Sequence, residues 1–114
     1  MRYLVHESEV NWEPHQKFKG VKVKILHTEK DQNSLATIVM TKVPEGEKVP
    51  VHVHENSDNI LHILEGSAKM EIDGIGVFQM GKGSCLRVPK NTRHQIYDVT
   101  EDLIVYDVFA PPAF

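Results

Sequence analysis

His52 and His54 are the two residues of this chain whose type and spacing most directly suggest chemistry. They lie two positions apart in the segment Val49-Pro50-Val51-His52-Val53-His54, whose β-branched residues favour a strand. Because side chains alternate between the two faces of a strand, both imidazoles point the same way. Two neutral imidazoles buried side by side need partners, and a metal ion is the simplest one. An edge strand with two solvated histidines is the alternative, since short motifs often occur by chance.

Two longer patterns extend this signal. The first is Gly46-x5-His52-x-His54-x4-Asn59-x6-Gly66, and the second is Gly83-x5-Pro89-x-Asn91-x2-His94-x3-Asp98. In order and spacing they resemble the paired motifs of the cupin family, G-x5-H-x-H-x3,4-E-x6-G and G-x5-P-x-G-x2-H-x3-N. The resemblance implies an all-β, double-stranded β-helix (jelly-roll) barrel. It also implies one divalent transition metal ion (Zn, Mn, Fe or Ni) with His52, His54 and His94 as ligands.

Asn59 stands where the family pattern has a metal-binding glutamate. Its amide oxygen could still act as a ligand, giving three imidazoles and one neutral oxygen. Without the glutamate charge, the double charge of the metal would favour an anionic ligand. Asp58 is the rival, although strand parity turns it away from His54 if the strand already begins there. A third option is that neither residue binds. Asn91 replaces the turn glycine of the pattern, which is a mild change because Asn tolerates the left-handed conformation.

The other histidines and the single cysteine are expected outside this site. His62 lies three residues beyond Asn59, so parity places it on the outer face of the sheet. Cys85 alternates with Leu86 and Val88, so it should face away from these core-facing residues, and an inert buried thiol is the expected form. Partly exposed positions outside both motifs are expected for His6, His15 and His27.

Asp107 interrupts the apolar run from Leu103 to Phe109. If Asp107 and Phe109 share the inner face, a carboxylate lies near the metal, and buried acids usually have a partner or a task. A strand-end acid that faces solvent is the alternative.

The ending from Asp107 to Phe114 is similar to the D-x-F-x-P-x-R ending of pectin-degradation cupins, which convert unsaturated uronates to open-chain keto acids. That likeness makes Asp107 the proton-transferring acid and Phe109 a pocket residue. Ala113 stands where those cupins have a carboxylate-binding arginine. Either another cation, Arg87 or Arg93, replaces it, or the substrate differs.

The elements that must position these residues are short strands separated by regular turn signals, which is typical of an all-β sandwich or barrel. Very little helix is expected, because no segment has a long 3.6-residue apolar period. Residues 1–18 form an N-terminal arm that could cover an open end of the barrel or swap onto a partner, and the barrel spans about 20–110. The predicted strands are Val21–His27, Leu35–Val43, Val49–His54, Asn59–Leu64, Ser67–Asp73, Gly76–Met80, Cys85–Val88, His94–Val99 and Leu103–Phe109.

Length and composition predict one domain over residues 1–114 with an ordinary globular composition. The net charge is −3 and the basic residues are scattered, so we expect no nucleic-acid partner. No apolar run approaches membrane-spanning length, and Met1–Phe18 lacks the apolar core of a secretory signal. The single Cys85 fits a reducing cytoplasm. Apolar residues near the start, including Trp12, suggest a homodimer.

These features favour a metal-dependent enzyme acting on a small anionic or sugar-like molecule by proton transfer, of the isomerase or lyase type. A three-histidine iron dioxygenase is the second hypothesis. A non-catalytic module that binds or senses a small molecule is the third, because one fold hosts many functions.

Overall fold

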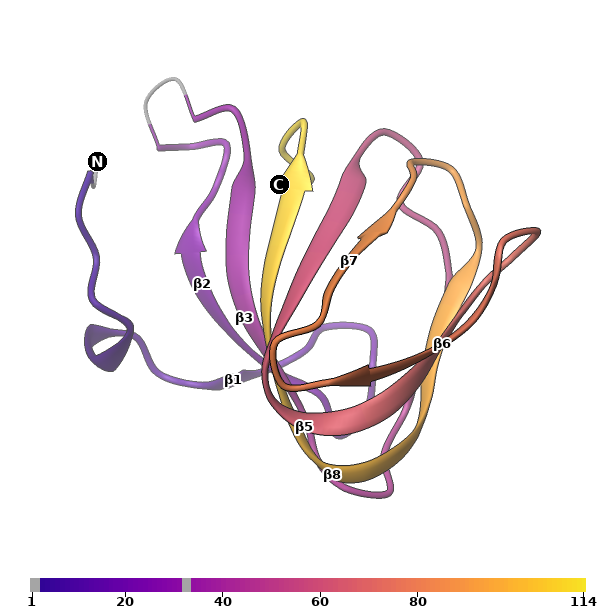
Figure 1. Ribbon diagram of the computed structural model, residues 1–114. Helices are drawn as coiled ribbons and strands as arrows, with labels where there is room; N and C mark the ends of the chain where they lie inside the picture. The colour runs from indigo at the N-terminus through magenta and orange to yellow at the C-terminus, as the bar shows by residue number, and fades with distance from the viewer. Residues whose placement is uncertain (1–2, 32–33) are drawn as a thin grey trace.

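The computed structural model describes residues 3–31 and 34–114, and strands dominate it (Figure 1). Met1 and Arg2 of the predicted arm, and positions 32 and 33 of the predicted domain, lie outside the described residues. One short 3-10 helix, Glu7–Glu9, precedes the strands. The strands are β1 (Glu13–Pro14), β2 (Lys22–His27), β3 (Thr37–Val43), β4 (Val49–His52), β5 (Asp58–Ile72), β6 (Gly76–Gly81), β7 (Cys85–Val88) and β8 (His94–Ala110).

The strands form an antiparallel sheet that folds over on itself because β5 and β8 belong to both of its halves. In one half, the end of β8 pairs with β3 and with the start of β5, which also pairs with β7. In the other half, the start of β8 pairs with β4 and with the end of β5, which also pairs with β6. The two long strands run side by side around the lower part of the barrel (Figure 1). The expected all-β jelly-roll fold is confirmed.

Two pairs of predicted strands are continuous in the structure. Asn59–Leu64 and Ser67–Asp73 are both parts of β5, and His94–Val99 and Leu103–Phe109 are both parts of β8. The residues between them continue the pairing through register shifts at positions 63 to 69 of β5. Such irregularities bend a strand without ending it, so turn-like composition in the middle of these strands marks a bend.

Gly66 lies at the bend of β5, and no other residue type fits there without rearrangement. Its φ is +95°, and a Cβ atom at this position would collide with the backbone of Asp102 in the neighbouring strand. Asn91 and Asp98, the two residues that depart from the second motif, adopt φ values of 55° and 49°. The left-handed conformation expected for Asn91 is confirmed.

The core lies between the two halves of the folded sheet. Alternate residues of β5 point inward, as strand geometry requires: Leu61 and Ile63 are buried and His62 is exposed. Burying such side chains is the main favourable contribution to folding. The cluster consists of Val21, Val43, Val49, Leu61, Ile63, Ala68, Met70, Ile72, Met80, Val88, Ile96, Val99, Leu103 and Val105.

The N-terminal arm packs on its own barrel. Its β1 pairs with the edge strand β2, with Glu13 opposite Val23 and Pro14 opposite Lys22. Phe18 then packs against the core cluster. In the described residues the arm thus covers part of the barrel of its own chain.

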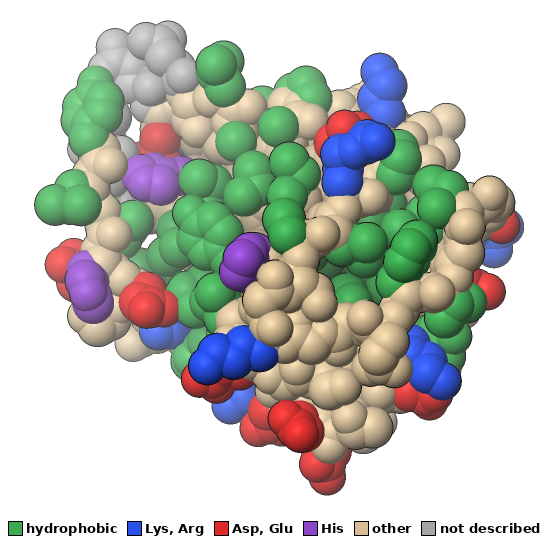
Figure 2. All heavy atoms as spheres, in the orientation of Figure 1, with side chains coloured by type: hydrophobic (Ala, Val, Ile, Leu, Met, Phe, Trp, Pro, Cys, Tyr) green, Lys and Arg blue, Asp and Glu red, His purple; other side chains and the backbone are tan. Residues whose placement is uncertain are grey.

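The surface carries several exposed apolar side chains, and Figure 2 shows hydrophobic side chains gathered across the middle of one face with charged side chains toward its margins. No helix in the described part of the chain is long and apolar enough to span a membrane. The exposed large hydrophobic residues are Tyr3, Leu4, Leu35, Val51, Val53, Leu64, Ile75, Val77, Phe78 and Phe114.

Candidate metal centre

The structure brings His52, His54 and His94 together inside the barrel. Their ring centroids are 4.2 Å apart for His52 and His94, 4.9 Å for His52 and His54, and 5.2 Å for His54 and His94. One ring nitrogen from each histidine lies within 4.8 Å of the others. Three imidazole nitrogens this close can share one metal ion with modest rearrangement, since zinc–imidazole bonds are about 2.0–2.1 Å long.

Sheet pairing brings these histidines together from distant parts of the chain. His52 ends β4 and pairs directly with His94 at the start of β8. β4 stops two residues earlier than predicted, so His54 lies beyond the strand. Its backbone oxygen accepts a hydrogen bond from Asn91 N at 2.7 Å, which ties the His54 loop to the turn before His94. Exposed Val51 and Val53 alternate with the two histidines, so the expected parity persists past the strand end.

Two of the histidines are oriented by backbone carbonyls. Nδ1 of His52 is 2.7 Å from the oxygen of Pro50, and Nδ1 of His94 is 2.9 Å from the oxygen of Thr92. A carbonyl oxygen can only accept, so both Nδ1 atoms carry the hydrogen and both Nε2 atoms keep a lone pair. This second contact is typical of metal-binding histidines, because it fixes the ring and its tautomer.

His94 Nε2 is the one buried side-chain nitrogen or oxygen in the described residues that has no hydrogen-bond partner. Leaving a buried polar atom unsatisfied costs about 1–3 kcal/mol, so such an atom needs an explanation. A metal ion would use this lone pair. The donor set therefore fits a transition metal that prefers nitrogen ligands.

All three histidines are held in the neutral form that binds metals. Burial lowers the pKa of His94 to about 4. Burial, followed by repulsion from the neighbouring imidazoles, lowers the pKa of His54 to about 4. The pKa of His52 is also lowered, mainly by burial. At neutral pH no proton competes for these ring nitrogens.

Asp107 lies buried beside this cluster in a small polar network. Thr41 Oγ1 donates to Asp107 Oδ2 at 2.6 Å, and Asn59 Nδ2 donates to Asp107 Oδ1 at 3.1 Å. Burial raises the pKa of Asp107 to about 6, and the two hydrogen bonds hold it lower than burial alone would. The solvent-facing alternative for Asp107 does not occur. Sequence reasoning missed Thr41, although its position two residues from the buried Val39 and Val43 places it on the same strand face.

Asn59 bonds to the acid and lines the same cavity as the histidines. It is buried at 4% exposure and also donates from Nδ2 to the oxygen of Val108 at 3.3 Å. With Nδ2 directed at β8, its Oδ1 is the atom that remains for a metal ion. Asp58, the rival ligand, points the other way and accepts from Lys90 N at 2.8 Å and Arg87 at 3.3 Å. Parity explains the difference, because the strand begins at Asp58.

A cavity of about 550 Å³ joins these groups. Its walls include the three histidines, Asn59, Asp107 and Phe109, together with apolar side chains from β2, β3, β4 and β5. The ring of Phe109 lies 4.8 Å from that of His54, edge to face. Six further lining residues come from the N-terminal arm, namely Glu13, Pro14, His15, Gln16, Lys17 and Phe18. Pro14 and Phe18 could be expected from their apolar character to cover the barrel, whereas the four polar residues could not.

The structure does not bring Arg87 to the cavity. Arg87 alternates with Leu86 and Val88, which point inward, so its side chain is on the outer face, 62% exposed and paired with Asp58. Arg93 is also exposed and is not among the cavity residues. Cys85 shares the outward parity of Arg87 and is exposed, so the expectation of a buried thiol is wrong.

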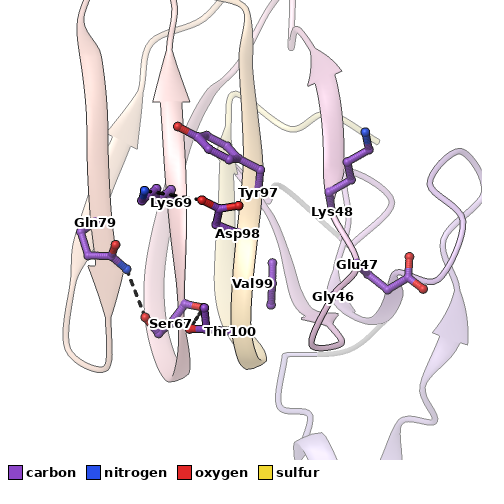
Figure 3. Close-up of a pocket in the computed structure, with 10 residues that line it drawn as sticks. All are labelled: Gly46, Glu47, Lys48, Ser67, Lys69, Gln79, Tyr97, Asp98, Val99 and Thr100. Carbon is purple, nitrogen blue, oxygen red and sulfur yellow. Dashed lines mark hydrogen bonds and ion pairs between the residues drawn. The ribbon is translucent and has the colours of Figure 1, made fainter.

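A second hollow, of about 780 Å³, lies away from the histidines (Figure 3). Lys69 and Asp98 form an ion pair at 3.5 Å across β5 and β8, and Gln79 Nε2 donates to Ser67 Oγ at 3.1 Å. This hollow is larger but more open, and its described lining residues include no histidine or cysteine. The histidine cavity is therefore the better candidate site.

Known proteins resemble this chain in sequence and in fold. The sequence profile of the cupin domain family matches residues 39–109, more than half of the chain. An uncharacterized protein of Methanocaldococcus jannaschii is 34% identical over 82 residues, 72% of this chain and 54% of that protein. Quercetin 2,3-dioxygenase of Bacillus subtilis is 31% identical over 71 residues, 62% of this chain and 21% of the enzyme. The chain thus spans about half of the first relative and about a fifth of the second.

One solved structure shows how far the fold agrees. KdgF from Halomonas sp. superposes with a TM-score of 0.77 at 24% identity, covering 93% of this chain and 92% of that one. At this level of identity the likeness concerns the fold alone.

Proposed function

The chain belongs to the cupin family, and we propose that it is a metal-dependent enzyme that moves a proton on a small anionic or sugar-like molecule. The reaction is of the isomerase or lyase type. The observation that carries this proposal is the single cavity lined by both the three histidines and the buried acid Asp107.

The proposed ligands are His52, His54 and His94, with Oδ1 of Asn59 as the fourth. A divalent zinc, manganese, iron or nickel ion bound there would polarise a carbonyl or hydroxyl oxygen of the substrate. The Nδ1 contacts to Pro50 and Thr92 hold two of the rings in place. Asn59, as a neutral ligand, leaves the charge of the centre to be balanced by an anionic substrate.

Asp107 accepts and returns the proton in this proposal. Its pKa of about 6 lies close enough to neutrality for the carboxylate to take a proton and release it again. The hydroxyl of Thr41 and the amide of Asn59 orient the two carboxylate oxygens. The likeness of the chain ending to that of pectin-degradation cupins supports the same role for Asp107, and Phe109 packs against the substrate.

Substitution of Asp107 by Asn tests this function. Exchange of the hydrogen next to the carbonyl in a panel of keto and uronic acids is followed by NMR in D2O, with the metal content measured in parallel. We expect the D107N variant to keep its metal and lose about a hundredfold or more in rate. The matched control is D58N, which alters an acid outside the cavity and should keep the rate. Undiminished exchange in metal-loaded D107N would make Asp107 structural.

A three-histidine iron dioxygenase is the second candidate, and the similarity to a bacterial quercetin 2,3-dioxygenase favours it. Iron in the purified protein together with substrate-dependent oxygen consumption would support this candidate against proton transfer. Zinc, nickel or manganese without oxygen uptake would support the first proposal. Tight binding of one ligand without turnover would instead indicate a sensing module.

A further inference from the structure

The mouth of the histidine cavity carries one permanent positive charge, on Lys17. Lys17 is the sole lysine or arginine among the described residues that line the cavity. Ala113 stands where pectin-degradation cupins have a carboxylate-binding arginine. It also lines the cavity but offers no charge. A cation at this mouth therefore comes from the N-terminal arm.

The fold fixes the arm at this place. Nδ1 of His15 accepts hydrogen bonds from Lys17 N at 3.0 Å and from Phe18 N at 3.2 Å, which caps the turn that presents Lys17. His15 N donates to Val21 O at 2.8 Å, so the turn is anchored to the start of β2. The Phe18 ring stacks on His15 at 4.5 Å and lies 4.9 Å from the ring of His52. These contacts fix the backbone of Lys17 beside Phe18, whose ring lies close to that of His52.

The charge of Lys17 is not committed to a partner. In the described residues no acidic side chain lies within ion-pair distance of it, whereas Lys69 pairs with Asp98 and Arg87 pairs with Asp58. After burial, the charge of Lys17 also contributes to the lowered pKa of His52. Its ammonium group is therefore within electrostatic range of the cavity.

The rest of the lining restricts the shape and polarity of a ligand. Most of the wall consists of aliphatic and aromatic side chains, among them Phe18 and Phe109 on two sides of the histidines. Apart from the histidine cluster and the network of Asp107, Thr41 and Asn59, the polar side chains of the described lining all come from the arm. The remaining wall is apolar and offers the hydroxyl groups of a sugar few hydrogen-bond partners. Glu13 also lines the mouth, so a second negative charge on the ligand would be repelled.

We propose that Lys17 binds the carboxylate of an apolar or aromatic monocarboxylic acid, whose body packs against Phe18 and Phe109 and whose other end faces the three histidines. This inference rests on the proposed function and narrows its substrate class, from anionic or sugar-like molecules to apolar monoacids. Lys17 replaces the missing arginine from a different element of the fold. An ammonium group is a point charge without the bidentate geometry of arginine, so it recognises the charge of the acid more than its orientation.

Calorimetric titration of zinc-loaded protein tests the inference. The probes are benzoate, cinnamate and galacturonate, each beside its neutral amide. We expect K17Q to weaken benzoate and cinnamate binding roughly tenfold and to leave the amides unchanged, while K17R retains acid binding. The matched control is K19Q, two residues further along the chain at an exposed position outside the cavity, which should change none of these affinities. Unchanged melting temperatures show that the arm variants are folded.

Several results would overturn the inference. These are equal acid binding by K17Q and the unsubstituted protein, equal losses in K17Q and K19Q, or no acid binding at all. Tighter binding of galacturonate than of cinnamate would overturn the apolar class. The same titrations in metal-free protein separate this inference from the proposed function. If the protein binds no metal or catalyses no proton exchange, the proposed function is wrong. The titrations of metal-free protein still show whether acid binding depends on Lys17.

Discussion

At His94, a buried ring nitrogen without a partner faces two other imidazoles. We predict that His94→Ala weakens metal binding by about a hundredfold or more, because losing a ligand costs at least as much as losing one of its supporting contacts. Metal content after dialysis, measured by mass spectrometry, checks this. His62→Ala is the matched control, since His62 is exposed on the outer face. Equal metal content in the two variants would remove the basis for the site.

The raised pKa of Asp107 makes the stability of the folded protein depend on pH. Its folded-state pKa of about 6 is above the ordinary value of 3.8. The stability it contributes is therefore fully present below about pH 4 and is lost as the pH rises through 6. The two-unit shift corresponds to about 3 kcal/mol. His54 and His94 act oppositely, because their lowered pKa values make stability fall as the pH drops toward 4.

Comparing metal-free D107N with the metal-free unsubstituted protein isolates the contribution of Asp107 to the pH dependence of the free energy of unfolding. Between about pH 4 and 7 the free energy of unfolding of D107N should rise by roughly 3 kcal/mol relative to that of the unsubstituted protein, since Asn does not ionise. Urea denaturation at the two pH values measures this difference. A difference that does not change with pH would mean that the carboxyl group titrates normally.

Among the strands, β5 depends on one residue for its bend. We predict that Gly66→Ala destabilises the protein by about 3 kcal/mol or more, because the backbone is left-handed and the added Cβ meets the backbone of Asp102. Gly74→Ala, at φ +74° with open space around the new atom, should cost only about 1 kcal/mol. Denaturant unfolding of both variants provides the measurement. Similar costs would show that the close approach at Gly66 relaxes easily.

The strands also show where local sequence is an incomplete guide. The turn signals and the β-branched residues predict that the barrel strands exist and in which order they come. The predicted Cys85–Val88 strand, for example, matches β7. These local signals do not predict that β5 and β8 are each one continuous strand. Residues near Gly66 and Asp98 have turn-like composition, yet pairing with the partner strand carries the chain through. β1 was missed because two residues hold no strand signal of their own.

For the whole molecule, we predict a homodimer that involves the apolar N-terminal residues. Tyr3 and Leu4 are 79% and 89% exposed, and burying them in a partner removes apolar surface from water. Light scattering after size exclusion should give about twice the 13.0 kDa chain mass. Leu4→Glu should shift the protein toward monomer, while Ile75→Glu, at a distant hairpin tip, should not. A monomer at all concentrations would contradict the prediction.

The sequence by itself determined the fold family and the three histidines. The spacing of His52 and His54 and the second motif with His94 are local properties, encoded by strand alternation and turn chemistry. The sequence left open whether Asp107 faces the interior or the solvent, and the structure buries it. The tertiary structure alone decided what these residues meet. Thr41 and Asp107 are 66 positions apart and bond only because β3 and β8 pair in one register. Arg87 faces outward by the same alternation that turns Leu86 and Val88 inward. Lys17 reaches the cavity because the arm pairs with β2 and packs against the core, which no local pattern encodes.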